Sequence, residues 1–317
     1  MPTPASTPVA SPALPWPHLL LALAVIAVWG TNFVVIGVAL AQMPPLTFAT
    51  LRFAFAALPW LLFVRPPRGV WRHVVGYGVV TGCGQFGLLY LAMRHDISPG
   101  LASLVIQAQV FFTVGLVAVL LRERPARRQI AAMLLAAAGL AITLLAADGA
   151  ATPLGLALTL GAAFSWAVSN LLVKSAGRID ALGFIVWASA FAALSLVALT
   201  LAVEGPTAAA VAIRHATPGT WLAVLWQAVG NTLFGYGAWS WLLARYPAAV
   251  ITPLSLLVPV FGMATSAGVL GEPMPAWKLA AAVLVIGALC INLQRPRRSA
   301  TDRAHAPSIP IENGRNA

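Results

Sequence analysis

The chain has 317 residues, of which 60% are hydrophobic and only 9% are charged, and its mean hydropathy is +0.87. Because a soluble domain carries about a quarter charged residues, this composition excludes an ordinary soluble protein and indicates a polytopic membrane protein. The net charge of +11 comes mostly from basic residues in short connections between apolar runs. That placement is typical of membrane topology and not of a nucleic-acid-binding surface.

Ten apolar segments are long enough, at about 20 residues, to cross a bilayer. The predicted fold is therefore an all-α polytopic membrane protein with ten transmembrane helices, the first of them retained and not cleaved as a signal peptide. Residues 1–16 and the basic residues 295–317 are predicted to be disordered tails. The ten predicted spans are 17–40, 45–64, 73–93, 98–121, 128–147, 153–174, 181–203, 219–243, 247–270 and 276–293.

Basic residues in the connections indicate the orientation of these spans. If the N-terminus is inside, fourteen lysines and arginines fall in inner segments and only Arg94, Arg214 and Lys278 in outer ones. This asymmetry predicts that both termini are cytoplasmic. The fourteen are Arg65, Arg68, Arg72, Arg122, Arg124, Arg127, Arg128, Lys174, Arg178, Arg245, Arg295, Arg297, Arg298 and Arg303.

The two halves of the chain share short motifs in the same order. For example, Phe55-Ala-Ala-Leu58 recurs as Phe191-Ala-Ala-Leu194. Because each copy would hold five spans, an odd number, the second copy is predicted to be inverted in the membrane. Inverted repeats with a site between them near the bilayer midplane are typical of transporters. The predicted repeats are 17–147 and 153–293.

Polar side chains in the fourth predicted span need partners, because an unpaired polar group in hydrocarbon costs several kcal/mol. At about 100° per residue, Ser103 and Gln107 share one helix face and Gln109 lies on another. We predict that Ser103 and Gln107 face the substrate and that Gln109 forms hydrogen bonds between helices. Interhelical hydrogen bonding is the alternative for Gln107.

The ninth predicted span places Ser255 and Pro259 on one face. Pro259 cannot bond back to the carbonyl of Ser255, and Pro253 likewise leaves the carbonyl of Ala249 free. Free carbonyls in a span are tolerated only where protein or a water-filled cavity satisfies them. We predict Ser255 and Pro259 as substrate-binding residues, with a helix kink of no ligand role as the alternative.

Two tryptophans lie near the middle of their spans, away from the interfacial belts that tryptophan prefers. Trp29 is followed by Asn32 at i+3, and Trp166 by Asn170 at i+4. An indole beside a carboxamide suits a small zwitterionic or amphipathic solute; a packed tryptophan with its N–H satisfied is the alternative. The predicted lining is completed by Gln85, Gln227 and Asn231.

Charged residues within or at the ends of spans form a second group of candidates. Burying Arg52 costs about 2.5–3.5 kcal/mol, so we expect it to clamp backbone carbonyls, with a substrate carboxylate as the alternative partner. Glu123 faces an unfavourable helix dipole and is expected to pair with nearby arginines. Arg52, Glu123 and Glu272 are interpreted as structural or gate residues. All eight carboxylates lie in loops, tails or span ends, so no buried carboxylate relay for protons is expected.

Several ordered motifs give the chain a family resemblance. Over residues 18–294 it resembles the drug/metabolite transporter superfamily and, within it, the ten-span bacterial exporters of O-acetylserine and cysteine. It departs from that pattern at Arg122, where a glycine is expected before the glutamate. The motifs include Trp29-Gly-Thr-Asn-Phe-Val-Val-Ile36, Leu51-Arg-Phe53, Gly100-Leu-Ala-Ser-Leu-Val, Gly235-Tyr-Gly237 and Pro253-Leu-Ser-Leu-Leu-Val-Pro259.

The resemblance implies a secondary transporter of the bacterial inner membrane that exports small amino-acid-like metabolites by alternating access. Export of other small amphipathic metabolites or drugs is the alternative, and a non-transporting membrane protein or a membrane-embedded enzyme is a more distant one. The sequence contains no HExxH motif and no paired intramembrane aspartates, so we expect no enzymatic activity, cofactor or metal. The expected partners are a small-molecule substrate and the lipid bilayer, without nucleic acid; a homodimer is left open.

Overall fold

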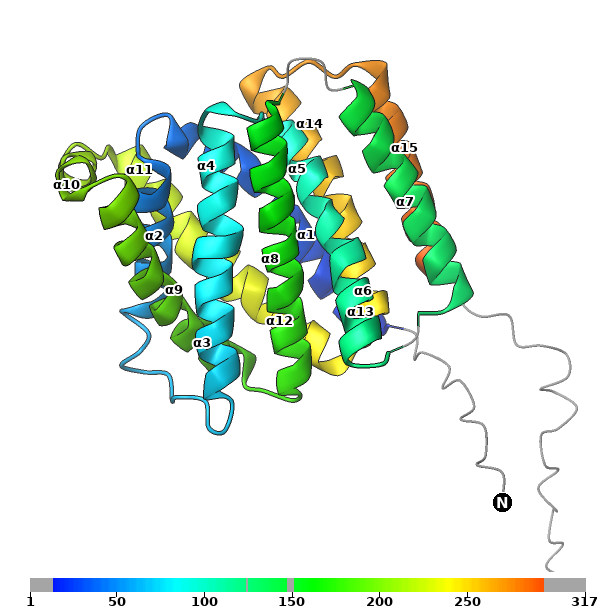
Figure 1. Cartoon of the computed structure of the whole chain (residues 1–317), viewed down its shortest axis with the longest axis horizontal. Coiled ribbons are helices and arrows are strands. Elements are labelled where there is room, and N and C mark those ends of the chain that lie inside the picture. The colour runs from blue at the N-terminus through cyan, green and yellow to red at the C-terminus, as the bar shows by residue number, and fades with distance from the viewer. Residues whose placement is uncertain (1–13, 124, 147–150, 294–317) are drawn as a thin grey trace, which may run out of the picture.

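The computed structural model describes residues 14–123, 125–146 and 151–293, so most of the two predicted tails lies outside the described residues. The helices stand side by side in one bundle, with α7 and α15 paired at one edge (Figure 1). The helices are α1 (Trp16–Leu40), α2 (Pro45–Ala57), α3 (Trp71–Val79), η1 (Val80–Gly87), α4 (Leu88–His95), α5 (Pro99–Val105), η2 (Ile106–Ala108), α6 (Gln109–Leu120), α7 (Arg127–Ala146), α8 (Pro153–Ala176), α9 (Ala181–Val203), α10 (Pro206–Arg214), α11 (Pro218–Leu225), η3 (Trp226–Tyr236), α12 (Gly237–Arg245), α13 (Ala248–Ile251), η4 (Thr252–Leu257), α14 (Val258–Leu270) and α15 (Ala276–Leu293).

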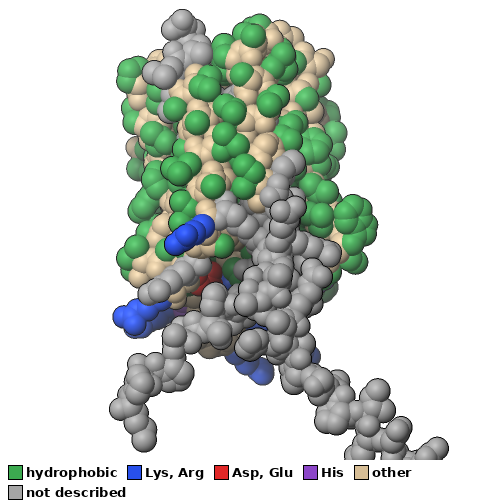
Figure 2. All heavy atoms as spheres, turned by 90° about the vertical axis from the view of Figure 1, so that its right-hand side faces the viewer, with side chains coloured by type: hydrophobic (Ala, Val, Ile, Leu, Met, Phe, Trp, Pro, Cys, Tyr) green, Lys and Arg blue, Asp and Glu red, His purple; other side chains and the backbone are tan. Residues whose placement is uncertain are grey.

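Six helical stretches of the described chain are long and apolar enough to cross a membrane. Hydrophobic side chains are spread over the upper part of the face seen in Figure 2, and the lysine and arginine side chains visible there lie toward the lower end. An apolar belt with basic residues at one end is typical of a multi-pass membrane protein. The six stretches are Trp16–Leu40, Trp71–His95, Pro99–Leu120, Pro153–Ala176, Ala181–Val203 and Ala248–Leu270.

The second predicted span differs from the structure. We predicted 45–64, but α2 ends at Ala57 after 13 residues, and turns continue the chain to Val64. Pro59 has no backbone N–H to donate to the preceding turn, which ends the regular helix. At 1.5 Å per residue, α2 is about 20 Å long, shorter than the hydrocarbon core of about 30 Å.

Four helical stretches are interrupted near their middles, in pairs from the two halves of the chain. A π-helical segment, η1, joins α3 to α4, and another, η3, joins α11 to α12. Likewise, the 3₁₀ segments η2 and η4 precede α6 and α14. Such departures from α-helical geometry are frequent at functional sites.

Helix α1 packs closely on α14 because Gly30 has no side chain. A Cβ atom on Gly30 would lie 2.4 Å from the Cβ of Phe261 and 2.7 Å from the carbonyl oxygen of Val258. This approach brings the neighbouring Trp29 into the middle of the bundle, where it is only 4% exposed.

Arg122 adopts φ +57°, and it is the one non-glycine residue with positive φ in the described chain. A side chain costs roughly 1–2 kcal/mol in this left-handed conformation. We expect Arg122→Gly to have a free energy of unfolding about 1 kcal/mol above that of Arg122→Ala, because both variants lose the same guanidinium and only glycine relieves the strain. Denaturant unfolding in detergent measures this difference; equal stability of the two variants would contradict it.

Candidate functional site

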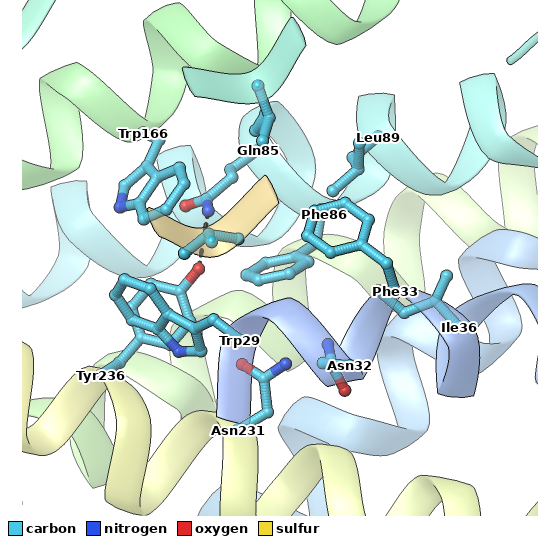
Figure 3. A pocket seen from close by; sticks show the side chains of 12 residues that line it. Trp29, Asn32, Phe33, Ile36, Gln85, Phe86, Leu89, Trp166, Asn231 and Tyr236 are labelled. Carbon is cyan, nitrogen blue, oxygen red and sulfur yellow. Dashed lines mark hydrogen bonds between the residues drawn. The ribbon is translucent and has the colours of Figure 1, made fainter. Parts of the chain in front are cut away.

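A cavity of about 30 Å³ lies between helices from both halves of the chain. Five predicted site residues line it: Trp29 and Asn32 from α1, Gln85 from η1, Trp166 from α8 and Asn231 from η3 (Figure 3). The rest of the lining is apolar or aromatic: Phe33, Ile36, Phe86, Leu89, Ile106, Tyr236 and Val258.

Aromatic rings form one wall of this central cavity. The Trp29 ring lies 5.1 Å from Trp166 in an edge-to-face arrangement and 4.7 Å from Tyr236, measured between centroids. Gly235 makes room for the indole, because a Cβ there would lie 2.5 Å from Trp29 Nε1.

Five buried polar atoms around the central cavity have no hydrogen-bond partner within the described residues. An unpaired buried group costs about 1–3 kcal/mol, and most such groups in native proteins are paired. Five of them around one small cavity therefore mark a place for a polar ligand. They are Nε1 of Trp29, Nε1 of Trp166, Oδ1 of Asn32, Oδ1 of Asn231 and Oε1 of Gln85.

The amide nitrogens beside two of these oxygens are already engaged. Nε2 of Gln85 donates to the Tyr236 hydroxyl at 2.7 Å (Figure 3), and Nδ2 of Asn32 donates to Oε1 of Gln227 at 3.4 Å. These bonds fix the amides and leave their oxygens as acceptors. The residues that line the cavity thus carry two unpaired indole N–H donors and three unpaired amide oxygens, a set that complements a carboxylate and an ammonium group in one small molecule.

Gln107, Asn170 and Ser255 belong instead to a hydrogen-bonded network outside the central cavity. Ser255 Oγ donates to Gln107 Oε1 at 3.1 Å and accepts from Gln109 Nε2 at 2.8 Å. Asn170 Nδ2 donates to Gln109 Oε1 at 3.1 Å, and Asn170 Oδ1 accepts from Trp239 Nε1 at 3.2 Å. The expectation that Gln109 bonds between helices is confirmed, and Gln107 follows the alternative reading. In the 3₁₀ turn η2, side chains two residues apart point in more similar directions around the helix axis than they would in an α-helix. Both glutamines can therefore reach Ser255.

Ser103 and Gln227 also lie away from the cavity lining. Ser103 Oγ donates to the carbonyl of Gly100 at 2.7 Å. Ser103 also packs on Gly262, where a Cβ would lie 2.9 Å from the Ser103 hydroxyl oxygen. Gln227 lies behind Asn32 and accepts its hydrogen bond.

The carbonyls that Pro253 and Pro259 release are both satisfied by protein groups. The Ala249 carbonyl accepts from Nε2 of Gln129 on α7 at 2.9 Å. The Ser255 carbonyl accepts from the backbone N–H of Val258. In this structure Pro259 therefore supports a helix kink and presents no free carbonyl to the cavity.

Arg52 is fully buried, and the expected clamp to backbone carbonyls was wrong. Its Nη1 donates to the Tyr90 hydroxyl and its Nη2 to Oγ1 of Thr232, both at 2.7 Å. Its Cζ lies 3.8 Å from the centroid of the Phe86 ring. Since Phe86 lines the central cavity, Arg52 supports the cavity wall from behind.

The two candidate gate glutamates lie near opposite ends of the bundle, as the directions of α6 and α14 in Figure 1 show. Glu123 pairs with Lys174 at 3.2 Å, and Lys174 also donates to the Tyr246 carbonyl at 2.8 Å. Of the arginines predicted to pair with Glu123, Arg124 and the side chain of Arg128 lie outside the described part of the chain, and the described ones form no ion pair with it. Glu272 follows Gly271, whose φ of +67° ends α14. Among the described residues, no aspartate or glutamate is buried.

Tyr236 and Phe86 also line the central cavity, although neither was predicted as a site residue. Tyr236 stands between two glycines in the Gly235-Tyr-Gly237 motif, and glycines beside an aromatic residue within a span were a usable signal of close packing around a ring. Phe86 follows Gln85 directly, so α-helical spacing gave no reason to expect both side chains at one cavity. Both residues belong to the π-helical segment η1, and both line the central cavity.

A methyl group at Gly235 tests the aromatic wall. We expect Gly235→Ala to displace the Trp29 indole and to lower transport about tenfold or more, because misplacing a binding group by about 1 Å has such effects. Gly237→Ala is the matched control, since a Cβ there meets no atom within 4 Å. Equal transport by both variants would contradict the importance of this wall.

Comparison with known proteins identifies the family. The model of the EamA-like transporter family matches twice, over residues 16–145 and 153–294. A probable amino-acid metabolite efflux pump of Salmonella typhimurium is 40% identical over 88% of this chain and 96% of its own length. A protein of the same description from Escherichia coli K12 is 37% identical over 86% of this chain and 94% of its own length. A probable terminal-alkyne amino-acid exporter of Streptantibioticus cattleyicolor is 30% identical over 84% of this chain and 88% of its own length.

A protein of known crystal structure has the same fold. It superposes with a TM-score of 0.66 at 22% identity, over 87% of this chain and 96% of its own. Together with the two family matches and the curated relatives, these observations show that the chain belongs to the EamA-like transporter family of the drug/metabolite transporter superfamily.

Proposed function

We propose that the protein exports small amino-acid-like metabolites, such as cysteine and O-acetylserine, across the bacterial inner membrane as a secondary transporter. The set of unpaired donors and acceptors around the central cavity carries this proposal. The substrate carboxylate would accept from the indole nitrogens of Trp29 and Trp166. Its ammonium group would donate to the amide oxygens of Asn32, Gln85 and Asn231. The names of the relatives, amino-acid metabolite efflux pumps and an amino-acid exporter, support the same substrate class.

Transport would proceed by alternating access between two inverted five-helix repeats, residues 17–147 and 153–293. The double match of the family model and the paired helix interruptions support this organisation. The central cavity of about 30 Å³ has room for only one or two waters. We interpret the structure as an occluded conformation in which the two repeats must separate to admit substrate.

The end of the bundle that holds Glu123 and Lys174 would face the cytoplasm, with both termini on that side. The basic residues near this end support the orientation. The Lys174 ammonium links the end of the α6 region to the connection before α13. This bridge would be a latch that opens when the cytoplasmic side of the cavity opens.

Counterflow in proteoliposomes tests the function. Purified protein is reconstituted, the vesicles are loaded with unlabelled cysteine, and uptake of labelled cysteine, O-acetylserine and neutral amino acids is followed beside protein-free vesicles. The proposal predicts saturable uptake that depends on the protein. If monodisperse, correctly inserted protein exchanges none of the amino acids but exchanges amphipathic drugs, the amino-acid assignment is wrong and the aromatic lining serves another substrate.

A further inference from the structure

A second and larger hollow, of about 510 Å³, lies at the end of the bundle where α3 and α9 begin. Figure 1 shows the α2–α3 and α8–α9 connections at this end. The first connection contributes Arg65, Pro66, Pro67, Arg68 and Val70, and the second contributes Arg178, Ile179 and Asp180. This basic hollow therefore joins loops from the two halves of the chain.

The charges that line the basic hollow are unbalanced. Arg65, Arg68 and Arg178 face a single carboxylate, that of Asp180. None of the three arginines forms an ion pair with another described residue. Three exposed guanidinium groups around one hollow form a site for an anion, because guanidinium groups bind phosphate oxygens through paired N–H donors.

Two helix N-termini add to this positive potential. Val70 immediately precedes α3 and Asp180 immediately precedes α9, and both residues line the basic hollow. The first backbone N–H groups of a helix are free to donate, and the helix dipole is positive at that end. Phosphate groups bind well where such an N-terminus is combined with arginine.

Apolar side chains that are next to the basic hollow in the sequence favour a lipid as the source of such an anion. Leu62 and Phe63, just before Arg65, are 85% and 81% exposed. Trp71 and Trp187 meet edge to face at 5.4 Å, and Trp187 Nε1 donates to the carbonyl of Val64 at 3.2 Å. Tryptophan with a polar contact is typical of the membrane–water interface. A ligand that satisfies both sets of groups has a phosphate next to hydrocarbon chains.

We propose that the basic hollow binds the head group of an anionic glycerophospholipid. The phosphate would lie among Arg65, Arg68 and Arg178, and the acyl chains would run along Leu62 and Phe63. Basic pockets between membrane helices bind anionic lipid head groups in this way. Because the arginines come from both halves of the chain, the bound lipid bridges the two connections.

Native mass spectrometry of the purified full-length chain tests the proposal. The protein is mixed with phosphatidylglycerol or phosphatidylcholine, and the retained lipid is counted. We expect retention of phosphatidylglycerol over phosphatidylcholine, and we expect Arg65→Gln/Arg178→Gln to lower it about tenfold or more. Arg127→Gln/Arg245→Gln is the matched control, since it removes the same charge from exposed arginines outside the hollow. Equal loss in both double variants would overturn the proposal.

A second variant tests the site without removing an arginine. Asp180→Asn should raise phosphatidylglycerol retention by about two- to fivefold, because it removes a negative charge that repels the lipid phosphate. The effect is modest since solvent screens this exposed charge. Its side chain makes no capping hydrogen bond to α9, so the fold should tolerate the change. Unchanged or reduced retention, or displacement of the lipid by millimolar inorganic phosphate, would contradict a lipid site; the latter would indicate a soluble anion.

Discussion

Replacing Asn231 by leucine should reduce cysteine counterflow by about ten- to a hundredfold while leaving the protein at least as stable as the wild type. The side chain is 2% exposed, and its Oδ1 has no partner in the described chain. Removing an unsatisfied buried acceptor does not cost folding energy, whereas a hydrogen bond to a charged group contributes about 1.5–3 kcal/mol. A ligand-binding residue therefore loses activity without losing stability.

Asn170→Leu is the matched control, because it makes the same substitution in a fully bonded amide. Loss of the Asn170 amide would leave Trp239 Nε1 and Gln109 Oε1 with fewer hydrogen-bond partners. Each group left unsatisfied would lower the free energy of unfolding by about 1–3 kcal/mol. Thermal unfolding in detergent and counterflow measured on both variants separate the two roles. A destabilised Asn231→Leu, or one that transports normally, would show that the central cavity is not the binding site.

Arg52→Ala should lower the free energy of unfolding by about 3 kcal/mol or more. The change removes both hydrogen bonds to Tyr90 and Thr232 and the contact with Phe86, and it leaves a void in a packed interior. Denaturant unfolding of the purified protein in mild detergent measures the loss.

Arg52→Met distinguishes support of the cavity wall from direct substrate binding. Methionine keeps much of the volume without the charge, and apolar replacement of a buried ion is often tolerated. We expect this variant to unfold within about 1–2 kcal/mol of the wild type and to keep measurable counterflow. A stable Arg52→Met protein with no counterflow would instead indicate that Arg52 binds the substrate carboxylate.

Hydropathy and charge predicted the all-helical membrane fold because both depend on long stretches of sequence. All six spans that length and composition identify in the structure coincide with predicted ones to within a few residues. The error in the second span depended on a single residue, Pro59, which ends α2 early although the following residues are apolar. The short helix α10 buries no residue. Its sequence was therefore not recognised as a helix from hydrophobic periodicity.

The site was predicted in part because polar residues in spans are few, and their presence alone draws attention to them. Trp29 and Asn32 share the cavity as their i+3 spacing suggested. Trp166 and Asn170 do not, because Asn170 turns to Gln109 and Trp239. Sequence spacing gives a face of one helix, but the neighbouring helix decides which polar groups find partners there.

The π-helical and 3₁₀ segments were a second limit to prediction. Gln85 and Phe86 reach one cavity in η1, and Gln107 and Gln109 reach one serine through η2. Both arrangements depart from 100° per residue, the angle that the prediction of helix faces assumed. Sequence alone did not reveal these local changes of helical pitch.

Counterflow with truncated substrates tests the central claim most directly. Cysteine, cysteamine, which lacks the carboxylate, and 3-mercaptopropionate, which lacks the ammonium group, are compared as competitors of labelled cysteine in vesicles containing the wild-type protein. If the indole nitrogens bind a carboxylate and the amide oxygens an ammonium group, only unlabelled cysteine competes well. Equal competition by either truncated compound would contradict recognition of the zwitterion by the central cavity.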